Sequence, residues 1–230
     1  MAYNPINAAT ANDSSNLLRQ GRSVEIQLRQ SFGTVAAGVS IKLGRLAADA
    51  KVAPTSDIQK TAITAQDEDG GQTINVDEVV TSTTVSYTGV AVVTPDDLVR
   101  SLHEGAPPTP IAGIEGATIS PFDPGASISV ALTVLRKGKK TADGTDMVTL
   151  YWHPDTAMTS AGFGDGDANT DRPLFDFTVR PWSGKLSSQL LAAYDGVKTV
   201  YGAIFRVPRS KLEQLQEALE GEIETDITAP

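Results

Sequence analysis

The feature that most constrains the fold is a stretch of alternating apolar and polar residues within positions 127–182. Apolar side chains fall on every second position over residues 128–134, again over 148–152 and again over 175–179. A period of two is typical of β-strands that bury one face. The first two runs are expected to pair as antiparallel strands through a turn-rich connection over residues 137–144. A long Gly/Asp-rich loop is expected before the third run, and these three strands are predicted to form the core of the sheet structure.

Further runs extend the β-rich pattern on both sides of this core. Residues 24–28 alternate in the same way, residues 39–43 fit a second strand, and residues 199–207 fit a last one. Residues 57–64 are expected to hold a short strand. The run over residues 79–93 has the highest β-propensity, because most of its side chains are β-branched and their stiff χ1 angles suit a pleated surface.

A short helix is predicted over residues 95–103, directly after the most β-branched run. Thr94 can cap its first turn, and Pro95 suits the first helical position. Asp96 and Asp97 complement the positive end of the helix dipole. Residues 105–110 contain glycine and three prolines, which end the helix and make a stiff connection.

A second helix is predicted at the C-terminal end of the chain. Pro208 breaks the last strand, and Ser210 with Glu213 forms the pattern of a capping box. The leucines that follow fall on one helical face, and Gly221 stands where the helix is expected to stop. Residues 222–226 are then expected to form an acidic tail.

No internal repeat and no domain linker interrupts this order of strands and short helices. The predicted fold class is therefore mainly β: a β-sandwich flanked by a short helix, with an extended N-terminal arm, a long loop and a C-terminal helix. Residues 1–22 form the arm, residues 23–207 the sandwich, and residues 208–230 the C-terminal helix and acidic tail. The N-terminal arm has two interpretations, a disordered tail or a segment that orders on a neighbouring subunit.

The charge and the residue inventory exclude several classes of chemistry. The chain has 230 residues, a formal charge of −9, two histidines and no cysteine. Because a protein that grips nucleic acid through its phosphates normally has a basic face, that kind of binding is disfavoured. The missing cysteine excludes disulfides, thiolate zinc sites and thiol catalysis. Neither a signal peptide nor a membrane-spanning run is found, so the protein is expected to be made in a cytoplasm.

Two acidic stretches invite a metal interpretation. Residues 67–71 contain three carboxylates followed by two glycines, and residues 165–171 place oxygen side chains at every second position, as in the first half of a calcium loop. Asp176 falls at the twelfth place of such a loop, but Thr170 occupies the sixth place, where the sharp turn needs glycine. Both stretches are interpreted as solvated loops, and neither a metal nor a cofactor is predicted.

The two histidines offer little support for catalysis. His103 ends the first predicted helix, where a cation suits the negative end of the dipole. His153 follows an alternating run and is expected to pack or to form hydrogen bonds at the end of a strand. A Ser/His/Asp arrangement is a spatial feature, but no Gly-x-Ser-x-Gly elbow precedes a helix. No catalytic residue is therefore predicted, and the chain is not expected to be an enzyme.

Three stretches give the chain a likeness to a known family: residues 150–154, the Gly-rich loop that follows them, and residues 175–179. In these stretches the chain resembles the major tail tube proteins of long-tailed, siphovirus-like bacteriophages. The order of a polar arm, a β-rich body, a short helix between strands and a mobile loop is also similar. The resemblance extends over residues 20–207.

The resemblance implies a structural protein of the virion. Six copies would form a ring whose inner sheets join into one barrel, and rings would stack into a tail tube through which DNA passes into the host. The partners would be other copies of the chain and the terminator, tape measure and distal tail proteins, with no membrane and no specific DNA binding. Closed rings would also remove the aggregation hazard of open strand edges.

An acidic chain suits such a conduit, because carboxylates repel the phosphates of sliding DNA. The candidates for acidic side chains that face the lumen are Asp77 and Glu78, which lie beside the run over residues 79–93. The alternative function is another virion component, such as a capsid decoration or tail accessory protein, or a binding module of the β-sandwich type.

Overall fold

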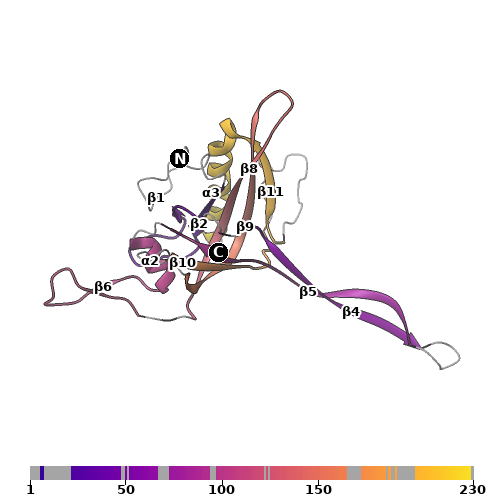
Figure 1. Ribbon diagram of the computed structural model, residues 1–230, viewed down its shortest axis with the longest axis horizontal. Helices are drawn as coiled ribbons and strands as arrows, with labels where there is room; N and C mark the ends of the chain where they lie inside the picture. The colour runs from indigo at the N-terminus through magenta and orange to yellow at the C-terminus, as the bar shows by residue number, and fades with distance from the viewer. Residues whose placement is uncertain are drawn as a thin grey trace.

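A computed structural model describes residues 6–7, 22–47, 50, 52–66, 73–93, 97–121, 123, 125–164, 172–184, 186–187, 190 and 200–228. Within these residues, most of the chain is β-strand (Figure 1). The strands are Ile6–Asn7 (β1), Arg22–Leu28 (β2), Ser40–Lys42 (β3), Thr55–Gln66 (β4), Thr73–Ala91 (β5), Thr109–Pro110 (β6), Thr118–Ile119 (β7), Ser127–Lys140 (β8), Asp146–Gly164 (β9), Arg172–Val179 (β10) and Ala203–Pro208 (β11). The helices are Asp97–Glu104 (α2), Arg209–Lys211 (η1, a 3₁₀ turn) and Leu212–Thr228 (α3).

Nine of these strands form one sheet, in the order β1-β3-β2-β8-β9-β10-β5-β4, with β11 beside β9. The sheet curls until the segment after β3 meets the end of β5. There the amide of Ala47 donates to the carbonyl of Ala91 at 3.0 Å, and the amide of Val93 donates to the carbonyl of Arg45 at 2.7 Å. Strands β2 and β3 therefore lie across an apolar interior from β5 and β10, as the two layers of a sandwich do.

The interior of the curled sheet, here called the inner core, is filled by the apolar side chains that occupy every second position of each strand. Its fully buried members come from β2, β3, β5, β8, β9, β10 and α2 and from Val92, which directly follows β5; they include Ile26, Leu28, Ile41, Val90, Val99, Val130, Leu132, Met158, Phe175 and Phe177. The helix α2 adds Val99 and Leu102 to this core, so it closes one end of the sheet. The prediction of a mainly β fold with one short helix and one C-terminal helix is confirmed.

The three strands predicted as the centre of the sheet are β8, β9 and β10, and they are neighbours in it. The predicted turn and loop between them are too long. Strand β8 continues to Lys140, and β9 continues through Pro154 to Gly164. The proline is tolerated because the β8–β9 register shifts between the pairs Val130↔Thr156 and Leu132↔His153, which leaves Pro154 in a bulge with no ladder bond to make.

Strand β9 is long enough to pair with two different strands along one edge. Its first half pairs with β11 from Met147 to Trp152, and its second half pairs with β10 from Thr156 to Gly164, while β8 lies along its other edge. The last predicted strand is shorter than expected, because β11 begins only at Ala203.

The outer face of the sheet carries a second apolar cluster, here called the outer core, which α3 covers. Buried members are Ala131, Leu135, Val148, Leu150, Trp152, Trp182, Leu186, Leu219 and Ile223. Trp152 and Trp182 meet edge to face, with ring centroids 5.5 Å apart. The helix is therefore part of the folded body, packed over β8, β9 and β11.

Two predictions about this helix were wrong. Ser210 does not cap it, because Ser210 lies inside the η1 turn, which follows Pro208 without a side-chain capping bond. Gly221 does not end it, and the predicted acidic tail is helical up to Thr228. The physical reason is tertiary: Ile223 is fully buried in the outer core, which holds the residues beyond Gly221 in the helix.

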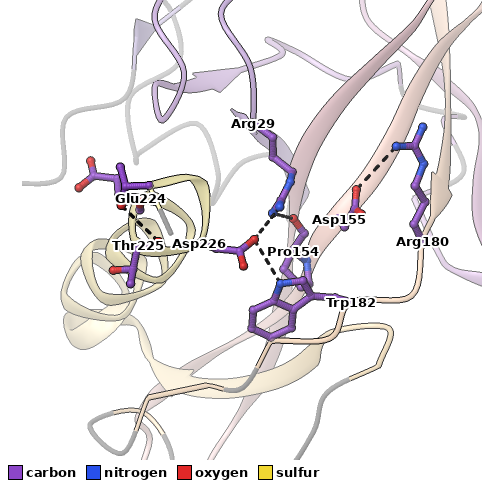
Figure 2. A network of polar contacts seen from close by, with 9 residues as sticks. Arg29, Pro154, Asp155, Arg180, Trp182, Glu224, Thr225 and Asp226 are labelled. Atoms are coloured by element: carbon purple, nitrogen blue, oxygen red, sulfur yellow. Dashed lines mark hydrogen bonds and ion pairs between the residues drawn. The ribbon is translucent and has the colours of Figure 1, made fainter. Parts of the chain in front are cut away.

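Polar contacts fix the last turns of α3 (Figure 2). The carboxylate of Asp226 accepts a hydrogen bond from Arg29 at 2.5 Å and one from Nε1 of Trp182 at 3.3 Å. Arg29 also donates to the carbonyl of Pro154 at 2.8 Å. Asp226 thus connects the helix directly to Arg29, which follows β2, and to the segment that follows β10, and Arg29 extends the contact to β9.

Gly221 gives a direct test of the continuous helix. A Cβ atom placed on Gly221 would meet no atom within 4 Å, and alanine is favoured over glycine in a helix interior. We expect Gly221→Ala to raise the free energy of unfolding by about 1 kcal/mol in urea titrations. A decrease would contradict a helix that continues through this position.

Some predictions concern residues that lie outside the described part of the chain. These are the cap at Thr94 with Pro95 and Asp96, the acidic stretch over residues 67–71, the calcium-like stretch over residues 165–171, and most of the arm over residues 1–22. Of that arm, Ile6–Asn7 is described as strand β1, which pairs in parallel with Ile41 and Lys42 of β3.

Candidate assembly surfaces

A two-stranded ribbon projects from the body (Figure 1), and most of its described side chains are exposed. It consists of β4 and residues 73–84 of β5. This ribbon is here called the arm, as distinct from the N-terminal arm over residues 1–22. Its strands pair along their whole length as an antiparallel ladder with two register shifts. Only residues 85–91 of β5 pair with β10 in the body. The strand expected over residues 57–64 is present, but it is longer than expected, because β4 is twelve residues long.

The arm carries apolar side chains on both of its faces. Ile58 and Val80 are 51% and 53% exposed on one face, and Ile63 and Val79 are each 47% exposed on the other. A two-stranded ribbon with no buried face is marginally stable in water. The outer edge of β4 also has no strand partner within the described chain, so it offers a row of unpaired backbone groups.

The two candidate lumen residues both lie on the arm. Asp77 stands opposite Ile63 and Glu78 opposite Ala62, so the two carboxylates point to opposite faces. Glu78 forms an ion pair with Lys60 at 2.9 Å, and the carboxylate of Asp77 accepts the amide of Glu78 at 2.8 Å. Both side chains are exposed, but only one of them can face any given surface.

A buried polar network joins the arm to the body. Nδ1 of His153 lies 2.6 Å from the carbonyl of Tyr201, and a carbonyl only accepts, so Nδ1 carries the proton. Nε2 then accepts the hydroxyl of Tyr87 at 2.7 Å. Burial lowers the pKa of His153 and raises that of Tyr87, which keeps both rings neutral. Tyr201 completes the network by donating to the carbonyl of Thr83 at 3.0 Å.

The second histidine, His103, lies beside a serine hydroxyl, but its ring nitrogen cannot act as the base that activates a nucleophile. Nε2 of His103 lies 2.9 Å from Oγ of Ser160 and 2.9 Å from the carbonyl of Gly162. Because the carbonyl can only accept, Nε2 carries a proton and cannot take one from Ser160. The ring also packs on Phe163 and Phe175, with centroids 4.6 and 5.4 Å away. The contact therefore fastens the end of α2 to β9.

A further group of polar contacts lies between α3 and strands β2 and β3. Glu25 of β2 is 3% exposed, and its carboxyl accepts a hydrogen bond from Gln216 at 3.2 Å. Gln27 donates to the backbone carbonyl of Glu220, and Ser40 donates to its side chain at 2.9 Å. A cavity of about 20 Å³, which is roughly the size that holds one water molecule, lies among these groups. Burial raises the pKa of Glu25 from 4.5 to about 7; Lys42 opposes the shift and Glu220 adds to it.

The described residues contain no group of three or more acidic or histidine side chains arranged to hold a metal ion. Among the same residues, no helix is long and apolar enough to cross a membrane. Comparison with models of known protein families finds no match, and comparison with curated proteins finds none either.

Sequence reasoning found the strands of the arm but missed that they leave the body. A signal was present, because Val79 and Val80 are adjacent apolar residues and Ile58 and Ile63 have opposite parity. Apolar residues on both parities normally indicate a strand that is buried on both faces. On the arm this pattern indicates two surfaces that the single chain leaves uncovered.

Proposed function

We propose that this chain is the structural subunit of a tube built from copies of itself, of the kind that forms the tail of a long-tailed bacteriophage. The observation that carries the proposal is the arm, which exposes β-branched side chains on both faces and an open strand edge. A monomeric protein gains nothing from such a ribbon, because its exposed edge is a site of aggregation. A ring of identical copies covers it, since head-to-tail contacts that close give cyclic symmetry.

The rest of the fold supports the same proposal. The body is held together by two apolar cores and by α3, so it can stay folded while the arm binds elsewhere. The Tyr87–His153–Tyr201 network joins Thr83 of the arm to β9 and to the residues before β11. A rigid subunit with a fixed projecting arm is what a regular assembly requires.

The proposed tube serves as a conduit for DNA during ejection. The formal charge of −9 favours passage without binding, because acidic side chains repel phosphates. Asp77 and Glu78 are the proposed lumen candidates, and only the one on the inward face of the arm would line the channel. The proposed location is the virion, with terminator, tape measure and distal tail proteins as partners at the ends of the tube.

Electron microscopy of the purified full chain tests this proposal. We expect rings and stacked rings in negative stain, and we expect the double variant Ile58→Lys/Val80→Lys to remove them, because two charges on one face of the arm cannot be buried. The matched control is Ile114→Lys/Ile119→Lys, which places the same charges on exposed isoleucines outside the arm.

Two outcomes would contradict the proposal. A wild-type protein that stays monomeric at millimolar concentration and at every salt concentration would rule out self-assembly. Trimers that bind capsid shells without stacking would instead indicate the alternative, another component of the virion.

A further inference from the structure

The end of the body that carries the β8–β9 hairpin is basic, although the chain as a whole is acidic. One cross-strand row there runs from Arg22 through Arg136 and Thr149 to Arg206, on four neighbouring strands. Arg136 and Arg206 are exposed and flank Thr149 on the same face. Two strand spacings separate them, a distance of about 10 Å.

Other basic residues gather around this row. Together with Arg22, Arg136 and Arg206, the basic end contains Lys137, Lys140, Arg209 and Lys211, from the β8–β9 hairpin and the η1 turn. The acidic residues among them are Asp143, Asp146 and Glu213. Asp146 pairs with Lys140 at 3.6 Å, and Asp143 accepts the hydroxyls of Thr141 and Thr145 within its own turn. Neither Arg136 nor Arg206 forms an ion pair with a described residue.

The basic end also offers an apolar contact and an open edge. Ile204, two residues before Arg206 on the same face, is 59% exposed. Strand β11 pairs with β9 on one side, and no described strand pairs with its other side. An incoming β-strand could therefore add to β11 through backbone hydrogen bonds, while its side chains meet Ile204 and Arg206.

The arm has the complementary properties. Its exposed carboxylates are Asp57, Asp77 and Glu78, with Lys60 as the only basic residue of the described arm. It carries exposed isoleucine and valine beside these acids, and the outer edge of β4 is open. The arm and the hairpin of the basic end leave the body in different directions (Figure 1), so one copy presents the two surfaces at separate places.

We infer that the basic end, through Arg136, Arg206 and the open edge of β11, is the receptor for the acidic arm of a second copy of this chain. The inference rests on the proposed self-assembly and names the two surfaces that meet. A second copy fits better than nucleic acid because the surface combines charge with Ile204 and a strand edge, and because the net charge of −9 opposes the approach of a polyanion.

A charge-swap experiment tests this pairing. One variant carries Arg136→Glu/Arg206→Glu and the other carries Asp77→Lys/Glu78→Lys. Each alone places like charges at the contact, so we expect assembly measured by light scattering to need a protein concentration about tenfold higher or more. An equimolar mixture restores opposite charges at every contact, and we expect it to assemble like the wild type. Urea unfolding of each variant, expected to match the wild type, shows that the fold is intact.

The outcomes separate this inference from the proposed function. If wild-type protein forms tubes and both variants do so equally well, or if the mixture is no better than its parts, the pairing is wrong and the tube stands. If wild-type protein forms no assembly, both are wrong. A short DNA duplex is the last probe: binding that is lost in the Arg136→Glu/Arg206→Glu variant, while assembly is unchanged, would assign the basic end to nucleic acid.

Discussion

At pH 8 the variant Glu25→Gln is expected to have a free energy of unfolding about 3 kcal/mol higher than the wild type, with almost no difference at pH 4.5. The reason is that burial raises the pKa of Glu25 from 4.5 to about 7. Between these two values the folded protein binds a proton that the unfolded chain does not bind. The contribution of Glu25 to stability is therefore fully present below pH 4.5 and is lost as the pH rises to 7.

Glutamine has the shape of the protonated carboxyl and does not titrate. Its side-chain oxygen can still accept the hydrogen bond from Gln216 under α3. Urea titrations of both proteins at pH 4.5, 6 and 8 measure the difference. The control is Glu224→Gln, on the exposed face of the same helix, for which we expect less than about 0.5 kcal/mol at any pH. A gain from Glu25→Gln that is equal at all three pH values would contradict a titrating buried carboxyl.

Truncation of the apolar anchor of α3 should have an effect of similar size and opposite sign. Ile223 is fully buried in the outer core, so we expect Ile223→Ala to lower the free energy of unfolding by about 3 kcal/mol. Because Asp226 follows within one turn, its bonds to Arg29 and Trp182 should weaken as well. A decrease in tryptophan emission intensity or a shift of its maximum would report that loss in the folded state.

The matched variant for this test is Glu224→Ala, next to Ile223 on the exposed side of α3. It removes a longer side chain without leaving a cavity, so we expect it to change stability by less than about 0.5 kcal/mol. If Ile223→Ala has an equally small effect, the helix does not pack on the sheet as described.

Two strands of the body were predictable because apolar residues occupy every second position in them. Residues 128–134 and 175–179 place these residues in the inner core, and they lie in β8 and β10 as expected. The same rule fails for β2, where the alternation of Glu25 and Gln27 with apolar residues indicates a solvent face. The face they mark is covered by α3, a contact between residues nearly 200 positions apart, which no local pattern reveals.

The other differences from prediction also have causes in the packing of the folded chain. In place of the long loop expected after residue 152, β9 continues because a bulge absorbs Pro154; the helix stop expected at Gly221 is absent because the burial of Ile223 carries α3 past it. Of the candidate site, the sequence located Asp77 and Glu78 beside a long strand, but not on a projecting arm. Arg136 and Arg206 become neighbours in one row only through the pairing of β8, β9 and β11.

Hydrogen exchange of β4 is the most direct test of the central claim, that the open arm of one copy is covered by another. The backbone amides of β4 that point away from β5 have no partner strand within the described chain. Exchange over residues 55–66, measured by mass spectrometry on dilute protein and on the assembled fraction, compares the arm alone with the arm in contact. Protection at least about tenfold greater in the assembled fraction is predicted. Equal exchange in both fractions would contradict the claim.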